Sequence, residues 1–134
     1  MSEDTNQVKV APGTIGWNEI VTSDKGGATE FYTQLFGWTA SEMEMPGGAT
    51  YTIFNQGERE VAGCVVPPGV KDVNPMWLAY VNVEDIDASV AKAKELGATI
   101  LADRVDLPMG SFTVLTDPQG ATFALWQSND SYES

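Results

Sequence analysis

The sequence predicts an α+β fold built from two consecutive copies of a β-α-β-β-β module. The first observation is an internal repeat, in which residues 17–39 reappear without a gap at residues 77–99 at a constant offset of 60. The second is that each half shows the same order of strand-like and helix-like patterns. That order is typical of an α+β fold and not of a doubly wound parallel sheet. The identical pairs are Trp17/Trp77, Val21/Val81, Ala28/Ala88, Gly37/Gly97 and Thr39/Thr99.

The first module, residues 14–66, begins with a strand at residues 14–22, which are rich in β-branched and aromatic side chains. Ser23 and Asp24 then offer an N-cap, and Gly37 ends the helix. Three further strands are predicted at residues 38–45, 50–55 and 60–66, separated by glycine-containing turns. The apolar side chains that recur at helical spacing, and that are expected to pack, are Ala28, Phe31, Tyr32, Leu35 and Phe36.

The second module, residues 76–127, follows a proline-rich linker at residues 67–75 and repeats the order. A strand at residues 77–83 precedes a helix that Asp85 caps and Gly97 ends. Strands at residues 98–105, 111–116 and 122–127 complete the module, with a tight turn at residues 117–120. The expected apolar helix face is Ile86, Val90, Ala93 and Leu96. We therefore expect one domain over residues 14–127, with flexible tails at residues 1–13 and 128–134.

The composition argues against several classes of partner. Nineteen acidic residues face 7 basic ones, for a formal net charge of −12, whereas nucleic acids and anionic membranes require clustered Lys and Arg. No apolar run is long enough to span a membrane, and the first residues do not form a secretory signal, so we expect a cytoplasmic protein. Cys64 is the single cysteine and is predicted to be a small, buried, apolar side chain. The acidity fits either a solvated surface or a field that attracts cationic ligands.

Three groups of residues resemble a known family. They are the string Phe31-Tyr32-x-x-Leu35-Phe36-Gly37-Trp38, the helix entry at residues 83–87 and the segment at residues 117–125. Together with Trp17-x-Glu19, they are similar to the vicinal oxygen chelate superfamily, which includes glyoxalases, bleomycin-resistance proteins and extradiol dioxygenases. The resemblance implies two βαβββ modules that form an open, cup-like half-barrel around a cavity. It also implies frequent dimerisation, so a homodimer is expected.

Enzymes of this family hold a divalent metal with histidine, glutamine or glutamate at four strand positions. In this sequence the resemblance places those positions at Trp17, a residue near Gly63 (within Ala62 to Cys64), Leu78 (or Trp77 by the repeat) and Ala124. None of these side chains is a good metal ligand, and the chain contains no histidine that could substitute. We therefore expect no metal and no cofactor, and no metal-dependent glyoxalase or dioxygenase activity.

The candidate ligand-binding residues are one carboxylate and a set of strand aromatics. Glu19 lies two residues after Trp17, so both side chains point to the same face of the first strand. A carboxylate in a partly apolar cup could act as a general base or hold a cationic ligand, although a purely structural role is the alternative. The aromatics could stack a flat ligand or attract a cation, or form ordinary core. The full set is Trp17, Glu19, Tyr51, Trp77, Tyr80, Phe112 and Trp126.

Three functions are consistent with the sequence. The leading hypothesis is a metal-free protein that binds a small aromatic or cationic organic ligand in the cup between its modules. The second is a metal-independent enzyme, such as an isomerase or hydrolase, with Glu19 as its acid or base. The third is an interaction module whose cup is filled by side chains or by a partner subunit. Loss of the family's metal ligands favours binding over catalysis.

Overall fold

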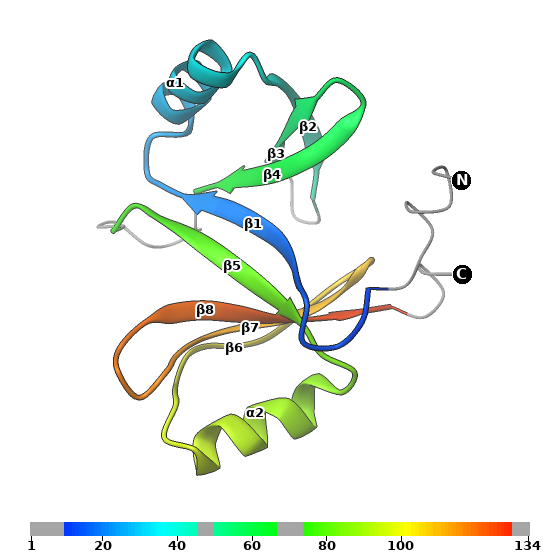
Figure 1. Cartoon of the computed structure of the whole chain (residues 1–134), viewed down its shortest axis with the longest axis vertical. Helices are drawn as coiled ribbons and strands as arrows, with labels where there is room; N and C mark the ends of the chain where they lie inside the picture. The colour runs from blue at the N-terminus through cyan, green and yellow to red at the C-terminus, as the bar shows by residue number, and fades with distance from the viewer. Residues whose placement is uncertain (1–9, 46–49, 67–73, 130–134) are drawn as a thin grey trace. The chain divides into compact units, whose positions relative to one another are not determined.

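The chain folds into strands and helices in the order that the sequence predicts. The computed structural model describes residues 10–45, 50–66 and 74–129 (Figure 1). Within that part of the chain, eight strands and two helices form two compact units with the same β-α-β-β-β order, which confirms the α+β class. The first unit comprises residues 17–78, and the second comprises residues 79–134 together with residues 1–16. The predicted turn between the strands at residues 38–45 and 50–55, at residues 46–48, lies outside the described residues, as do residues 67–73 of the predicted linker.

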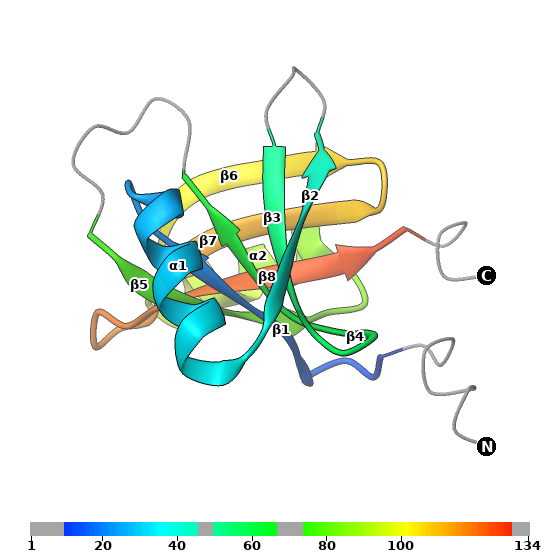
Figure 2. The ribbon, with the colours of Figure 1, turned by 90° about the horizontal axis from the view of Figure 1, so that it is seen from above.

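The first unit contains a sheet with the strand order β2-β3-β4-β1, in which β1 runs parallel to β4 and the other pairs are antiparallel. Figure 2 shows β2 and β3 as a long antiparallel pair. The elements are β1 (Ile15–Val21), α1 (Lys25–Phe36), β2 (Thr39–Glu44), β3 (Thr50–Gln56) and β4 (Arg59–Val65). The first two residues of β1 are grouped with the second unit.

The core of the first unit lies between α1 and the sheet. Ile20, Phe54, Ala62 and Cys64 are buried there, and Ala28, Tyr32 and Trp38 pack against them. The prediction that all of the apolar side chains of α1 pack was wrong for three of them. Phe31, Leu35 and Phe36 are 57%, 57% and 55% exposed, respectively. With 3.6 residues per turn, the helix directs Ala28 and Tyr32 towards the sheet, and its neighbouring apolar side chains fall on its flanks.

The second unit repeats this design, with the strand order β5-β8-β7-β6 and β5 parallel to β8. Ile86, Leu115 and Leu125 form its buried core, and Val90 and Ala93 of its helix pack against them. Leu96, which was expected on the packed face, is 65% exposed. The elements are β5 (Met76–Asn82), α2 (Ile86–Glu95), β6 (Thr99–Leu107), β7 (Gly110–Thr116) and β8 (Thr122–Ser128).

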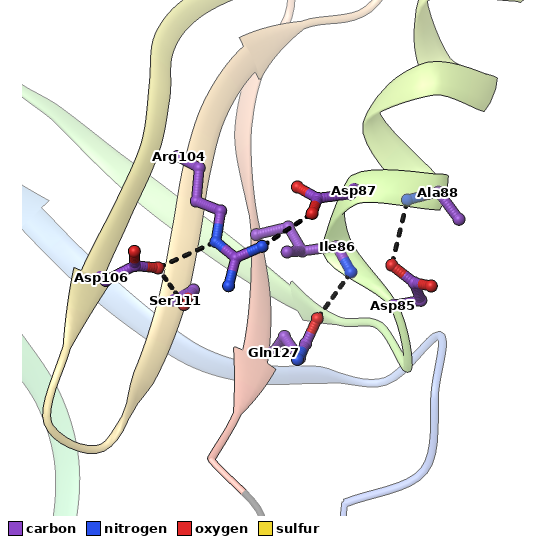
Figure 3. Close-up of polar contacts among 8 residues, drawn as sticks. All are labelled: Asp85, Ile86, Asp87, Ala88, Arg104, Asp106, Ser111 and Gln127. Carbon is purple, nitrogen blue, oxygen red and sulfur yellow. Dashed lines mark hydrogen bonds and ion pairs between the residues drawn. The ribbon is translucent and has the colours of Figure 1, made fainter.

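The predicted helix signals act as expected. Asp24 Oδ1 accepts a hydrogen bond from the Gly27 amide at 2.9 Å, and Asp85 Oδ1 accepts one from the Ala88 amide at 3.1 Å. Caps of this kind stabilise a helix by about 1 kcal/mol each. In the second unit Gln127 Oε1 also accepts from the Ile86 amide at 2.7 Å, which ties β8 to the start of α2 (Figure 3).

The repeat of the sequence and the repeat of the structure differ by one residue. Glu19 pairs with Gly63 in the first unit, and Tyr80 pairs with Ala124 at the equivalent place in the second. The strands therefore correspond at an offset of 61, as do the caps Asp24 and Asp85, whereas Gly37 and Gly97 correspond at 60. The second helix segment is one residue shorter, so strand positions matched at an offset of 60 lie on opposite sheet faces.

The folded part of the chain extends slightly beyond the predicted domain limits. The Gly13 amide donates to the Asn82 carbonyl at 2.7 Å, and the Asn129 amide donates to the Met109 carbonyl at 2.9 Å. Among the described residues, neither helix has the length and apolar character needed to cross a membrane.

Candidate ligand-binding site

Two of the predicted site residues, Trp17 and Glu19, share the face of β1 that points away from α1. Ile20, which follows them, lies in the core beneath the helix. Side chains alternate along a strand, so residues 17 and 19 point to the opposite face. Trp17 and Glu19 therefore lie on one face of β1, and both side chains contact the Tyr51 hydroxyl. We call this surface, with the parts of β3 and β4 that adjoin it, the open face of the first unit, because α1 does not cover it; Glu19 and Gly63 on it are buried, and Trp17 and Tyr51 are partly buried.

A chain of hydrogen bonds joins Trp17, Tyr51 and Glu19 on that face. The Trp17 indole Nε1 donates to the Tyr51 hydroxyl at 2.8 Å. The Tyr51 hydroxyl in turn donates to Glu19 Oε1 at 2.9 Å. Glu19 is only 7% exposed, so this chain holds a buried carboxyl group in one orientation.

Tyr51, which lies in the middle of this series of hydrogen bonds, is held in its protonated form. Burial is the largest cause, followed by the charge of Glu19, and both raise the pKa of the Tyr51 hydroxyl far above its ordinary value. A hydroxyl that keeps its proton can continue to donate to Glu19 at all physiological pH values. The Tyr51 hydroxyl is thus a fixed hydrogen-bond donor to Glu19.

Gly63 provides the space that Tyr51 occupies. Gly63 is the register partner of Glu19 on β4, and it is buried. A Cβ atom at this position would overlap the Tyr51 hydroxyl and would lie 2.9 Å from the Tyr51 Cε2 atom. Sequence reasoning placed a family metal position near this glycine but could not detect its fit to Tyr51, because the two residues belong to different strands.

A second group of predicted residues, Tyr80, Phe112 and Trp126, shares one face of the second unit. Phe112 pairs directly with Trp126, and Tyr80 pairs with Ala124, two residues before Trp126. The Tyr80 and Phe112 rings meet edge to face, with centroids 6.0 Å apart. Val81 and Leu125 point the other way and pack in the core with α2. The three aromatics therefore lie on the face away from that helix.

Trp77 does not join either group. Its ring meets the Tyr32 ring of α1 edge to face, with centroids 5.4 Å apart, and its side chain is 46% exposed. An offset of 60, as the Trp17/Trp77 identity suggests, would put these two residues on equivalent faces, but the strands correspond at an offset of 61. The counterpart of Trp17 is Leu78, which is 4% exposed.

The four family metal positions do not carry side chains that suit a metal ion. The Trp17 indole nitrogen is a hydrogen-bond donor without an available lone pair, and its hydrogen is already given to Tyr51. Gly63, Leu78 and Ala124 offer no side-chain donor atom. Within residues 10–45, 50–66 and 74–129, no three His, Cys, Asp or Glu side chains are grouped as a metal site would require.

Two hollows lie away from the hydrogen-bonded chain. One, of about 450 Å³, lies on α1 and is lined by Gly27, Glu30, Phe31, Gln34 and Leu35. The other, of about 360 Å³, lies beside β6, β7 and β8 and includes Arg104, Asp106, Ser111 and Gln127. Neither is lined by a residue of the predicted ligand-binding set.

The hollow of the second unit is bordered by a network of charges. Arg104 contacts Asp87 and Asp106, each at 2.8 Å, and the Ser111 hydroxyl donates to Asp106 at 2.6 Å (Figure 3). The hydrogen bond from Ser111, followed by that from Arg104, lowers the pKa of Asp106 below its ordinary value. Because both carboxylates engage the guanidinium, this network ties α2 to β6 and does not present an anion-binding site.

Comparisons with known proteins agree with the fold. The sequence profile of the Glyoxalase/Bleomycin resistance protein/Dioxygenase superfamily matches residues 14–125. A Mycobacterium tuberculosis protein named as a glyoxylase, CFP32, is 41% identical over 114 residues, which are 84% of this chain and 43% of that protein. The anthracycline biosynthesis protein DnrV of Streptomyces peucetius is 32% identical over 126 residues, or 94% of this chain and 46% of that protein. The chain thus spans about half the length of the curated relatives it matches.

Solved structures show the same fold at low sequence identity. Hypothetical protein BH1468 of Bacillus halodurans superposes with a TM-score of 0.63 at 13% identity, over 87% of this chain and 95% of that chain. Methylmalonyl-CoA epimerase of Streptomyces coelicolor, in complex with 2-nitronate-propionyl-CoA, gives a TM-score of 0.61 at 17% identity, over 88% and 99% of the two chains. The predicted fold class is confirmed by these matches.

Proposed function

Because the chain belongs to the glyoxalase/bleomycin resistance protein/dioxygenase superfamily, we propose that it is a metal-free member that binds a small, flat, cationic organic molecule. The proposed site is the open face of the first unit, where Trp17, Tyr51 and Glu19 lie. The observation that carries the proposal is the pairing of a buried carboxyl group with aromatic side chains at a place where the family's metal ligands are missing. A metal-centred reaction is not proposed, because the side chains at those positions do not fit a metal.

The chemistry of the open face supports a cationic ligand. An ionised carboxylate at low exposure attracts positive charge more strongly than one in water, because the surrounding dielectric constant is lower. Tryptophan and tyrosine rings attract cations over their faces and stack on flat molecules. The formal net charge of −12 adds a long-range field of the same sign.

The relatives give further support for a flat ligand. One of them is named as an anthracycline biosynthesis protein, and anthracyclines are flat polycyclic compounds. We propose that this chain binds a molecule of comparable shape. On the second unit, Phe112 and Trp126 are partly buried aromatic side chains of the same kind, whereas Tyr80 beside them is buried.

A thermal-shift titration with doxorubicin, a flat cation, and with its uncharged aglycone tests this proposal. A ligand at about 100 times its dissociation constant stabilises the folded state by about 2.7 kcal/mol. We expect the wild type to bind the cation more tightly than the aglycone. Glu19→Gln removes the charge but keeps an oxygen that accepts from the Tyr51 hydroxyl, so this variant should lose the preference while staying folded.

The matched control is Glu60→Gln, which makes the same change at an exposed position of β4. This variant should bind both compounds like the wild type. Equal cation binding by wild type and Glu19→Gln would refute the proposed site. Equal weakening in both variants would assign the preference to the overall charge and not to Glu19.

A second candidate function is a metal-independent enzyme that uses Glu19 as its acid or base. It is favoured by the Tyr51 hydrogen bond, which orients a buried carboxyl group as catalysis would require. Mass spectrometry of the bound compound after incubation distinguishes the two functions. A binding protein returns the ligand unchanged, whereas an enzyme returns a product that the Glu19→Gln variant does not form.

A further inference from the structure

The outer surface of α1 carries an exposed apolar patch that the fold of one chain leaves uncovered. Phe31, Leu35 and Phe36 are 55–57% exposed, and Trp77 is 46% exposed. The three aromatic rings of this set each contact the Tyr32 ring, with centroid distances of 5.0, 6.1 and 5.4 Å. Leu35 joins the set because it lines the same hollow as Phe31. We call Phe31, Leu35, Phe36 and Trp77 the α1 patch.

The patch has the apolar area of a protein interface. An aromatic side chain has about 150–250 Å² of surface, so four large side chains at about half exposure leave on the order of 400 Å². Monomeric proteins rarely expose more than a few hundred Å² of contiguous apolar surface. A stable dimer covers about 800 Å² on each partner, of which about 450 Å² or more is apolar. The α1 patch supplies most of that amount from one helix and its neighbour.

Helix α1 carries few charged side chains. The chain has a formal net charge of −12, so two copies repel wherever charged surfaces meet. Helix α1 carries two charged side chains, Lys25 and Glu30, which are opposite in sign. The ten-residue helix α2 carries four, Asp87, Lys92, Lys94 and Glu95, and none of its own apolar side chains is among the large exposed ones. The α1 patch is therefore a surface with few charged side chains, on which a second copy meets little repulsion.

We propose that the α1 patch is the contact surface between two copies of this chain. In a two-fold dimer each copy presents the same patch to the other. Antiparallel packing of the two α1 helices sets Leu35 and Phe36 of each copy against the first turn of the other, which contains Lys25, Gly26 and Gly27. The hollow of about 450 Å³ beside Gly27 then receives an apolar side chain of the partner. This proposal is independent of the ligand and of the role of Glu19.

Sedimentation velocity on the full chain over a range of concentrations tests the proposal. The wild type should sediment as a dimer, and Leu35→Glu should raise the dissociation constant on the order of a hundredfold, because it buries an unpaired charge in the contact. Leu96→Glu is the matched control, since Leu96 is 65% exposed at the end of α2 and the change in charge is the same. It should leave the dimer intact.

Two results would overturn the proposal. One is a wild type that stays monomeric at all concentrations up to the millimolar range. The other is a Leu35→Glu variant that dimerises as tightly as Leu96→Glu. Hydrogen exchange of the wild type provides a test that needs no variant. Protection of the α1 amides should rise with protein concentration while that of the α2 amides stays constant, and the proposal fails if α1 shows no such rise.

Discussion

Replacement of Gly63 by alanine should break the Trp17–Tyr51–Glu19 chain. The added methyl group would overlap the Tyr51 hydroxyl, so the ring must swing away and give up both of its hydrogen bonds. The neutral bond from Trp17 stabilises the fold by about 1 kcal/mol, and the bond to a carboxylate by about 1.5–3 kcal/mol. Alanine recovers part of this because it reduces the freedom of the unfolded chain. We expect a net loss of about 2–3 kcal/mol, or roughly 10 °C in Tm.

Urea denaturation followed by tryptophan fluorescence measures this loss. Gly26→Ala is the matched control, because a Cβ at that helix position meets nothing closer than Asp24 Oδ1 at 4.0 Å. That variant should gain about 0.5–1 kcal/mol, opposite in sign to Gly63→Ala. Tyr51→Phe removes the same two hydrogen bonds, so the double variant should cost less than the sum of the single ones. A stable Gly63→Ala variant, or strictly additive losses, would refute this account of the site.

Two further predictions concern buried polar groups. Burial raises the pKa of the Cys64 thiol from 9.0 to about 11. The protonated thiol therefore contributes its full stability below pH 9, and this contribution is lost as the pH rises to about 11. The free energy of unfolding of the wild type should fall across that pH range. That of Cys64→Ala, which has no thiol to titrate, should fall less steeply, and parallel pH curves for the two proteins would contradict this. Within the described residues, the buried Thr113 hydroxyl has no hydrogen-bond partner, so Thr113→Val should stabilise the fold by about 1 kcal/mol in thermal denaturation. Thr52→Val, at an equally buried threonine that donates to Glu42 at 2.8 Å, should destabilise it, and equal effects would show that the hydrogen bond does not matter.

The sequence predicted those features that depend on local signals. Asp24, Asp85 and Gly37 mark helix ends through their own backbone and side-chain chemistry, and all three act where they were predicted. Alternation along a single strand placed Trp17 and Glu19 on one face for the same reason. These features need no knowledge of the rest of the fold.

Features that depend on a second element could not be predicted from the sequence. The five identities of the repeat favoured an offset of 60, but one residue fewer in the second helix segment changed the strand offset to 61 and reversed the face of Trp77. Helical spacing of apolar residues identified Phe31, Leu35 and Phe36, yet spacing cannot tell a core contact from a surface. The fit of Tyr51 over Gly63 required the packing of two strands.

The parallel pairing of β1 with β4, and of β5 with β8, has a consequence for how the chain folds. Each pair joins residues 44 positions apart, 19 with 63 and 80 with 124, whereas β2, β3 and β4, like β6, β7 and β8, pair with their neighbours in sequence. Closing a long loop costs more entropy than closing a hairpin, and non-local pairing slows folding. We therefore expect the hairpins to form first and β1 and β5 to join them late. The chain of hydrogen bonds at Glu19 then forms only in the last step, when β1 enters its sheet.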